Sequence, residues 1–233
     1  MDKKCCTAIV LAGGSGKRMG TKTHKQYLLI GGKAVLYYSL KAFQDSELID
    51  EIILVTGSGE EEYCRQMIVE KYDIRKVSCI ISGGKERYES VWNGLRQIEK
   101  DGFVFIHDGA RPFVDGEMIR RAYECVSRCS ACAAGMPAKD TIKVVDEKGT
   151  VVDTPDRNRL WIVQTPQVFD ARIVYEAYEL LMDKQITAVT DDAMVVEKML
   201  GFPVRMFEGS YENIKITTPE DMETAEAFLK KLT

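Results

Sequence analysis

Short apolar runs alternate along the chain with longer segments of helical periodicity. Helical patterns lie near residues 34–44, 59–72, 86–99 and 115–128. The strand-like runs before, between and after them are Ala8–Leu11, Ile52–Thr56, Val77–Ser82, Phe103–His107 and Cys132–Pro137. Alternating strands and helices favour a mostly parallel sheet covered by helices on both faces. The pattern therefore predicts an α/β fold with a doubly wound, Rossmann-like sheet.

The alternation breaks at residues 139–160, where no helical pattern is present. Two β-branched runs flank the turn Asp146-Glu147-Lys148-Gly149, which is typical of a β-hairpin. A hairpin inserted in an α/β domain commonly forms an arm or an edge extension. Beyond it we expect helices near 170–182 and 191–200, strands near 204–208 and 213–217, and a last helix from Pro219. Residues 1–233 are expected to form one domain carrying this arm.

Composition excludes several classes of protein. The 233 residues, 45% hydrophobic and 29% charged, suit one globular domain. The formal net charge is −4, so any anion-binding site must be local, and no nucleic-acid partner is expected. No apolar run approaches the roughly 20 residues of a membrane span. The N-terminal residues do not resemble a signal peptide. We therefore expect a cytoplasmic protein without a membrane partner.

The seven cysteines are an odd number, which argues against a disulfide framework. Cys125, Cys129 and Cys132 have a spacing that suits metal ligands, but they are three without a fourth. The two histidines, His24 and His107, lie in unrelated segments. We therefore expect ordinary packed thiols.

The first strand leads directly into the glycine-rich segment Leu11-Ala-Gly-Gly-Ser-Gly-Lys-Arg-Met-Gly20. Glycines let backbone N–H groups face an anion, and Lys17, Arg18 and Lys25 add positive charge. This indicates a polyphosphate site at the carboxyl end of the strand. The segment fails the P-loop pattern, because position 11 is Leu and position 18 is Arg.

A dinucleotide-dependent reductase is a remote alternative. The glycine spacing is looser than the dinucleotide fingerprint, and the second strand ends in Val55-Thr56-Gly57, without an acidic residue for a ribose. Tyr37 and Lys41 have the spacing of a reductase pair, but they precede the second strand. That position is too early to face the ligand crevice of the sheet.

Taken with the rest of the chain, the loop resembles that of nucleotidyltransferases acting on sugar and polyol phosphates. Further segments narrow the resemblance to the 2-C-methyl-D-erythritol 4-phosphate cytidylyltransferase family of the non-mevalonate isoprenoid pathway. They are Lys25-Gln-Tyr27, Gly83-Gly-Lys-Glu-Arg-Tyr-Glu-Ser-Val91, His107-Asp-Gly-Ala-Arg-Pro112, Lys139-Asp-Thr-Ile-Lys143, Asp156-Arg-Asn-Arg-Leu-Trp161, Gln164-Thr-Pro-Gln167, Thr190-Asp-Asp192 and Asn213-Ile-Lys-Ile-Thr217. Two positions depart from the family: His24 replaces a frequent Pro, and Lys85 replaces an acidic residue of some members.

The resemblance implies transfer of CMP from CTP to 2-C-methyl-D-erythritol 4-phosphate, with release of pyrophosphate. A phosphate oxygen would attack the α-phosphorus in line. The protein must then supply cations, N–H groups and Mg²⁺ rather than a nucleophile. The nearest rival is a ribitol 5-phosphate cytidylyltransferase. A catalytically silent nucleotide-binding subunit would not need four cations in one crevice.

The resemblance also assigns residues to roles. The catalytic candidates are Arg18 and Lys25 at the α-phosphorus, and Arg157 and Lys215 at the attacking phosphate. The candidates for CTP binding are Ala12, Gly13, Gly14, Gly16, Arg18, Lys25, Gly84, Ser90 and Asp108. The candidates for the polyol phosphate are Thr141, Arg157, Thr165, Thr190 and Lys215. Asp108 is the candidate Mg²⁺ ligand, with a helix cap or a partner for Arg111 as the structural alternative.

The arm predicts a homodimer. Its β-branched runs, Thr141–Val145 and Thr150–Val152, would expose apolar side chains on a monomer, and a second arm would cover them. The resemblance implies that Arg157 then serves the active site of the partner subunit. The alternative is a hairpin folded back on its own domain, with Arg157 acting in its own subunit.

Overall fold

The computed structural model describes residues 3–14, 24–99, 101–184 and 188–232. Within them, seven strands form one sheet in the order β11-β7-β10-β6-β1-β4-β5, and only β10 is antiparallel to its neighbours. The strands are β1 (Cys6–Ala12), β4 (Glu51–Thr56), β5 (Val77–Ser82), β6 (Phe103–Asp108), β7 (Ala131–Pro137), β10 (Trp161–Asp170) and β11 (Arg205–Glu208). The predicted α/β fold is confirmed.

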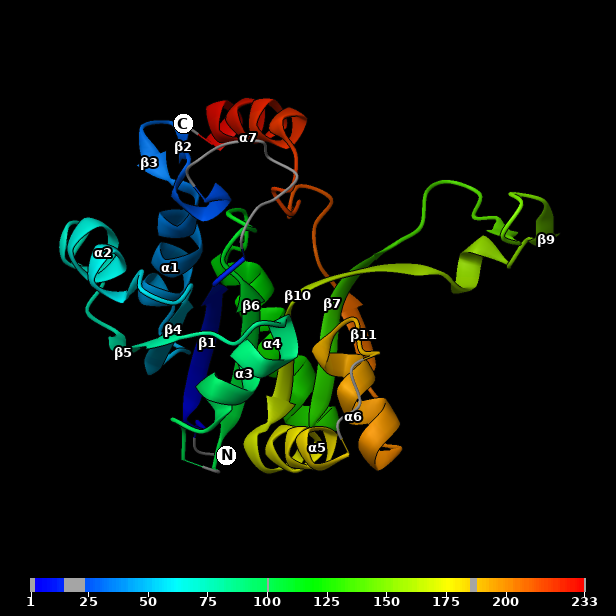
Figure 1. Cartoon of the computed structure of the whole chain (residues 1–233), viewed down its shortest axis with the longest axis horizontal. Helices are drawn as coiled ribbons and strands as arrows, with labels where there is room; N and C mark the ends of the chain where they lie inside the picture. The colour runs from blue at the N-terminus through cyan, green and yellow to red at the C-terminus, as the bar shows by residue number, and fades with distance from the viewer. Residues whose placement is uncertain (1–2, 15–23, 100, 185–187, 233) are drawn as a thin grey trace.

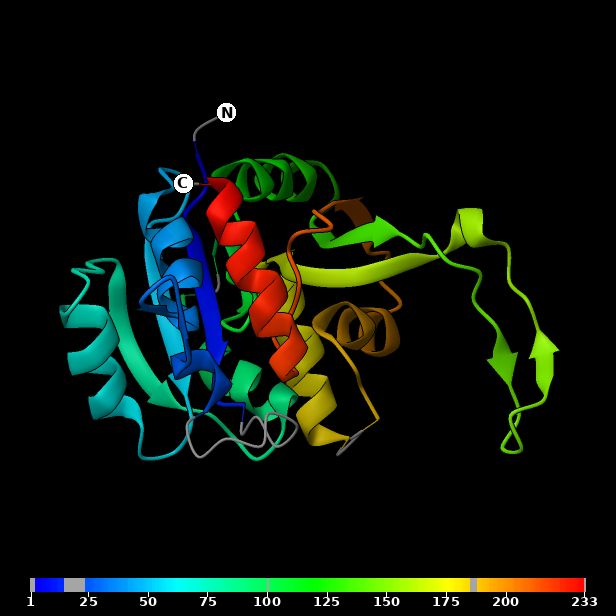
Figure 2. The same ribbon diagram turned by 90° about the horizontal axis from the view of Figure 1, so that it is seen from above.

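Helices cover both faces of this sheet (Figures 1 and 2). One face carries α1 (Val35–Asp45) and α4 (Gly116–Cys129). The other carries α3 (Arg87–Leu95), α5 (Ala171–Asp183) and α6 (Asp192–Leu200). Successive side chains of a strand point to opposite faces, so Ala8 and Val10 of β1 pack in the first core and Ile9 packs in the second.

Smaller elements complete the fold. The helix α2 (Glu61–Cys64) continues as a π-helical segment at Arg65–Glu70. The helix α7 (Pro219–Leu232) covers a third apolar cluster beside the short strands β2 (Leu29–Ile30) and β3 (Lys33–Ala34). Single 3-10 turns lie at Lys25–Tyr27 and Arg157–Arg159. No helix in the described part of the chain combines the length and apolarity that crossing a bilayer requires.

Sequence reasoning missed one long strand, and one strand that it predicted is absent from the described residues. The strand β10 was missed, because Pro166 and the polar residues Gln164 and Gln167 hide it, and its register shifts between Val163 and Gln167. The strand expected at 213–217 is irregular backbone. Its alternation arises instead because Ile216 packs in the cluster under α7 and donates its N–H to Ala110 O at 2.8 Å.

The predicted hairpin is confirmed and is carried on an extended arm. The strands β8 (Val144–Val145) and β9 (Val151–Asp153) pair antiparallel, and Gly149 has the positive φ of +80° that their turn requires. Figures 1 and 2 show the arm leaving the body between β7 and β10. The hairpin is therefore not folded back on its own domain. Its apolar side chains are exposed, with 61% of Val152 accessible.

Candidate active site

Two cavities, of about 300 and 280 Å³, lie next to one another at one edge of the sheet. Arg87, Asp108 and Lys215 line both of them. The first cavity is bounded by the ends of β1 and β6 and by the start of α3. These are the carboxyl ends of parallel strands, where open α/β sheets bind ligands. The arrangement can therefore hold two ligands side by side.

Glycines bring backbone to the wall of the first cavity. A Cβ atom on Gly13 would lie 3.1 Å from the carbonyl oxygen of Thr56, and one on Gly84 would lie 2.3 Å from Glu89 Cβ. Side chains at these positions would force the loops apart. The wall is therefore formed by close-packed main chain, which can approach a ligand directly.

Ser90 fixes the turn at Gly83 and Gly84. Its Oγ accepts a hydrogen bond from Gly84 N–H at 3.0 Å and donates to Glu86 O at 3.2 Å. Gly83 N–H donates to Thr56 O at 2.7 Å. Both amide donors of the turn are thus engaged within the protein, so the backbone group that Gly84 can present to a ligand in the first cavity is its carbonyl oxygen. This arrangement suits a ligand group that donates hydrogen bonds.

Asp108 is the electrostatic centre of the site. Its carboxylate accepts from Arg87 Nε at 3.2 Å and from Lys215 Nζ at 2.9 Å, and Arg111 Nε lies 3.7 Å away. Burial alone would raise the pKa of Asp108, but the three cations hold it well below its usual range. The carboxylate is therefore permanently charged and anchors Lys215 at the junction of the two cavities.

Arg87 is fixed by a second carboxylate, that of Asp192. Both terminal nitrogens of its guanidinium donate to the carboxylate of Asp192 at 2.8 Å, in the bidentate geometry that arginine favours. Asp192 is fully buried and also accepts from Tyr178 O–H at 2.5 Å. Burial, followed by this carboxylate, raises the pKa of Tyr178 well above its usual range. The network fixes one cation between the two cavities.

His107 and Thr165 join β6 to β10. Burial lowers the pKa of His107 to about 4, so the ring is neutral near pH 7. Its Nε2 donates to Arg111 O at 3.1 Å, and its Nδ1 then accepts from Thr165 O–H at 3.0 Å. The same hydroxyl accepts from Asp108 N–H at 3.0 Å. Thr165 thus positions the backbone of Asp108.

Asn213 fixes the irregular segment that carries Lys215. Its side-chain amide donates to Thr165 O at 2.8 Å, and its own carbonyl accepts from Arg111 at 2.8 Å. These bonds tie residues 213–217 to β10 and to the corner after β6. Lys215 therefore reaches Asp108 without belonging to a strand.

The structure brings together most of the predicted site residues that it describes. Ala12, Gly13, Gly14, Lys25, Gly84, Ser90 and Asp108 line the first cavity, which Lys215 shares. Thr165 and Thr190 line the second cavity, together with Asp108 and Lys215. The predictions for Gly16 and Arg18 lie outside the described residues.

Thr141 and Arg157 are not brought to these cavities. Both are exposed on the arm, and Arg157 donates to Lys139 O at 2.8 Å. Neither residue lines either of these two cavities. The role predicted for Arg157 thus requires either movement of the arm or a second subunit.

Sequence reasoning missed the network that joins Arg87, Asp192 and Tyr178. It also missed Gln26, whose side chain lines the first cavity and donates to Ala12 O. One signal was present, because Arg87 is the first residue of α3 and a cation there opposes the helix dipole unless an anion lies nearby. The partner was hidden, since Asp192 is 105 positions away. Nothing in the sequence joins the two residues.

The reductase-like pair is not part of the site. Lys41 pairs with Asp45 one helical turn away, and Tyr37 O–H accepts from Lys33 at 3.1 Å. Neither Tyr37 nor Lys41 lines either cavity. The geometry gives no support to hydride-transfer chemistry by this pair.

The sequence matches known proteins over nearly its whole length. The profile of the family 2-C-methyl-D-erythritol 4-phosphate cytidylyltransferase (IspD) matches residues 6–231. A relative with that name from Lachnospira eligens is 53% identical over 225 residues, which cover 96% of this chain and 99% of the relative. Another from Clostridium beijerinckii is 49% identical over 226 residues, covering 97% and 99% of the two chains.

Solved structures give the same assignment. The 4-diphosphocytidyl-2C-methyl-D-erythritol synthase of Anaerococcus prevotii superposes with a TM-score of 0.86 and 34% identity, covering 98% of this chain and 97% of that one. The 2-C-methyl-D-erythritol 4-phosphate cytidylyltransferase of Francisella tularensis has a TM-score of 0.80 and 31% identity, with 96% and 99% covered. Fold, paired cavities and sequence agree, and the chain belongs to the 2-C-methyl-D-erythritol 4-phosphate cytidylyltransferase family.

Proposed function

We propose that this enzyme transfers CMP from CTP to 2-C-methyl-D-erythritol 4-phosphate, giving 4-diphosphocytidyl-2-C-methyl-D-erythritol and pyrophosphate. The observation that carries the proposal is the pair of cavities that share Arg87, Asp108 and Lys215. Two anionic reactants must meet in this reaction, and cations common to both cavities lower the repulsion between them.

CTP occupies the first cavity in this proposal. The carbonyl oxygen of Gly84, which lines this cavity and whose N–H is already engaged, would suit the exocyclic amino group of cytosine, which donates hydrogen bonds. Uracil has an acceptor at that position, so the same turn would discriminate against UTP. Lys25, which also lines this cavity, is placed to contact the triphosphate. Arg18 remains the second candidate at the α-phosphorus, on the basis of the sequence.

The polyol phosphate occupies the second cavity. Its phosphate would lie against Lys215, and its hydroxyl groups near Thr190 and Gln164. A phosphate oxygen already carries negative charge, so no general base is required. Lys215 and Arg87 orient that oxygen toward the α-phosphorus of CTP, and pyrophosphate leaves on the opposite side. Fixed geometry supplies the main catalytic effect in this mechanism.

The site also fits Mg²⁺, provided that the nucleotide supplies most of the ligands. Asp108 is the one carboxylate that lines both cavities, beside Arg87 and Lys215. Among the described residues, no group of three carboxylate or histidine ligands surrounds it. Mg²⁺ commonly binds through one or two carboxylates plus substrate phosphates and water. When bound, the ion would neutralise charge on the triphosphate.

The proposed assembly is a homodimer built through the arm, with Arg157 contributed to the active site of the partner subunit. The projecting arm, its exposed valines and the position of Arg157 outside both cavities support this arrangement. The proposed compartment is the cytoplasm, where thiols such as the seven free cysteines stay reduced.

A direct assay tests the reaction. The purified chain is incubated with CTP, Mg²⁺ and either 2-C-methyl-D-erythritol 4-phosphate or ribitol 5-phosphate, and pyrophosphate release is followed. Rapid release with the methylerythritol substrate alone is expected, and UTP in place of CTP should react slowly. Faster release with ribitol 5-phosphate would assign the rival activity. Release with neither polyol would overturn both assignments.

A further inference from the structure

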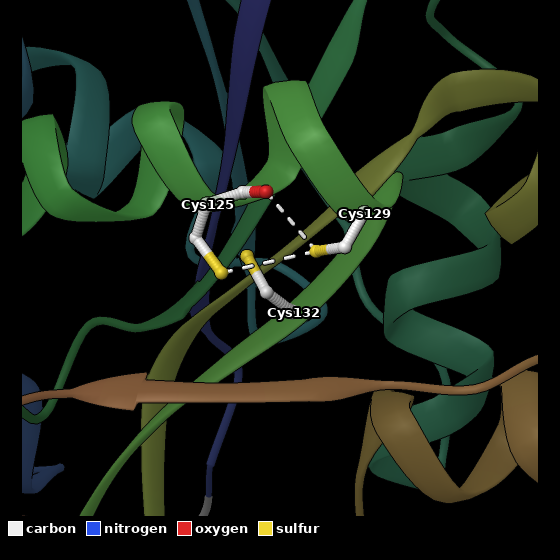
Figure 3. Close-up of side chains that lie close together, drawn as sticks. All are labelled: Cys125, Cys129 and Cys132. Atoms are coloured by element: carbon white, nitrogen blue, oxygen red, sulfur yellow. Dashed lines mark hydrogen bonds between the residues drawn. The ribbon is translucent and has the colours of Figure 1, made fainter.

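Three cysteine side chains meet between α4 and β7, away from both cavities (Figure 3). Cys125 and Cys129 belong to α4, and Cys132 is the second residue of β7. Their three Sγ atoms all lie within 4.8 Å of one another, and the Cys125 and Cys129 sulfurs are 3.8 Å apart. Among the described residues, this is the one group of three or more side chains placed to share a metal ion.

Rigid elements hold the three sulfurs together. Cys125 and Cys129 are four residues apart and therefore occupy one face of the helix. Ser130 adopts a left-handed conformation with φ of +62° and donates its N–H to Val126 O, which turns the chain back under the helix. Cys132 is fully buried in a strand paired on both sides, with β10 and β11. The cluster is therefore formed before any ligand arrives.

The spacing of the sulfurs suits tetrahedral coordination. A zinc–sulfur bond of about 2.3 Å implies sulfurs about 3.8 Å apart around a tetrahedral ion. Cys125 and Cys129 already have that separation, and the remaining distances need to close by at most about 1 Å to reach it. Both side chains are only half-buried, so water can reach a fourth position. A three-ligand site with one open position removes the need for a fourth cysteine.

A cationic side chain beside the cluster also suits a metal ion. Thiolate is the form that binds metal. Three thiolates around a divalent ion leave one negative charge. Arg205, opposite Cys132 on β11, can balance that charge.

We propose that Cys125, Cys129 and Cys132 form a trithiolate site that binds one Zn²⁺ ion, separate from the transfer reaction. The ion replaces the protons of the three thiols, so binding releases up to three protons. The proposed site stabilises the junction of α4 and β7, because the ion joins the end of the helix to the adjacent strand.

A zinc titration of the full chain, reduced and freed of metal, tests the proposal. Competition with a chromophoric chelator should show one tightly held Zn²⁺ per chain, with affinity that rises as pH increases. Cys125→Ser and Cys129→Ser should each weaken binding by at least about 100-fold, since losing a ligand costs more than losing a supporting residue. Cys79→Ser is the matched control, because Cys79 is a half-buried thiol outside the cluster, and it should bind like the wild type.

Two further measurements test whether the cysteine sulfurs themselves bind the ion. Cd²⁺ should produce an ultraviolet thiolate charge-transfer band in the wild type that both cluster variants lose. Zn²⁺ should raise the Tm of the wild type but not of Cys129→Ser, because a ligand that binds only the folded state stabilises it. Circular dichroism confirms that each variant is folded. If the folded wild type binds no Zn²⁺, or if binding survives both cluster substitutions, the cysteines are packed thiols and the proposal is wrong.

Discussion

Lys215 occupies the point where the two cavities join, and the anchor that holds it there is the carboxylate of Asp108. We predict that Lys215→Ala lowers turnover by about 10²–10³, the usual cost of removing one charge donor from a transition state. Folding should be almost unchanged, because Asp108 keeps Arg87 and Arg111 as partners. Steady-state rates of pyrophosphate release, with thermal unfolding as a check of folding, measure both effects.

The matched control is Lys231→Ala, which removes an exposed lysine at the end of α7 and should keep the wild-type rate. If Lys215→Ala retained more than half of the activity, Lys215 would not be a catalytic residue.

His107 gives the site a measurable response to acid. Burial lowers its pKa from 6.5 to about 4, so protonation is easier in the unfolded chain than in the folded one. Protonation of the unfolded chain therefore leaves the free energy of unfolding at its full value above pH 6.5 and lowers it as pH falls toward 4. The expected loss across this window is on the order of 3 kcal/mol. Urea unfolding at several pH values measures it.

The comparison variant is His107→Gln, which retains polar groups but cannot titrate. Its free energy of unfolding should change less between pH 6.5 and pH 4, whatever its cost at pH 8. Equal pH slopes in the two proteins would show that His107 is not the group responsible.

At the scale of elements, the sequence predicts those helices and strands whose own residues show a clear hydrophobic pattern. The central strands were found because strands buried on both faces are continuous apolar runs, as in Ile52–Thr56. The strand β10 was missed because Pro166 interrupts it and because Gln164 and Gln167, which line the second cavity, are polar. Its place between β6 and β7 depends on pairings that no local pattern contains.

The same division applies to the site. Glycines beside the first cavity are visible in sequence, because close backbone packing requires that residue at Gly13 and Gly84. The buried pair of Arg87 and Asp192 is not visible, because it forms only when α3 and α6 meet across the same edge of the sheet. The geometry of Lys215 likewise depends on Asn213 and β10, not on the strand that its alternation suggested.

The arm is the element whose proposed role can be tested by complementation. We predict that co-expression of an Arg18→Ala chain with an Arg157→Ala chain restores roughly a quarter of wild-type activity in the unsorted mixture, because about half of randomly paired dimers are mixed and each mixed two-fold dimer holds one intact site. If Arg157 acts within its own subunit, every site carries one lesion and no activity returns. Affinity tags on the two chains isolate the mixed dimer, which should have about half of the wild-type activity per dimer.

Each variant expressed alone is the control and should be inactive. Light scattering at the assay concentration should give the mass of two chains. A monomer, or an inactive mixed dimer, would contradict the proposed exchange of Arg157.

The whole molecule carries a net charge of −4, yet it must bind two anionic substrates. Three cations around Asp108 neutralise only part of the charge of a triphosphate and a phosphate. We therefore predict that a chelator abolishes pyrophosphate release and that added Mg²⁺ restores it. The control is the same chelator saturated with Mg²⁺, which should leave the rate unchanged. Full turnover in metal-free buffer would exclude the role proposed for Asp108 as a metal ligand.

The position of the arm has a consequence for how this enzyme can change over evolutionary time. Pro137 at the end of β7 lies directly opposite Trp161 at the start of β10, so the 138–160 segment is an elongated connection between neighbouring strands. A short turn could close the same gap, and doubling the length of a flexible connection costs only about 0.6 kcal/mol. Insertions, deletions or grafted recognition sequences can therefore accumulate in the turn between β8 and β9 without altering strand order. Subunit association can diversify at the hairpin while Arg157, which lies between the hairpin and β10, and the cavity residues Gln164, Thr165 and Gln167 of β10 are inherited intact.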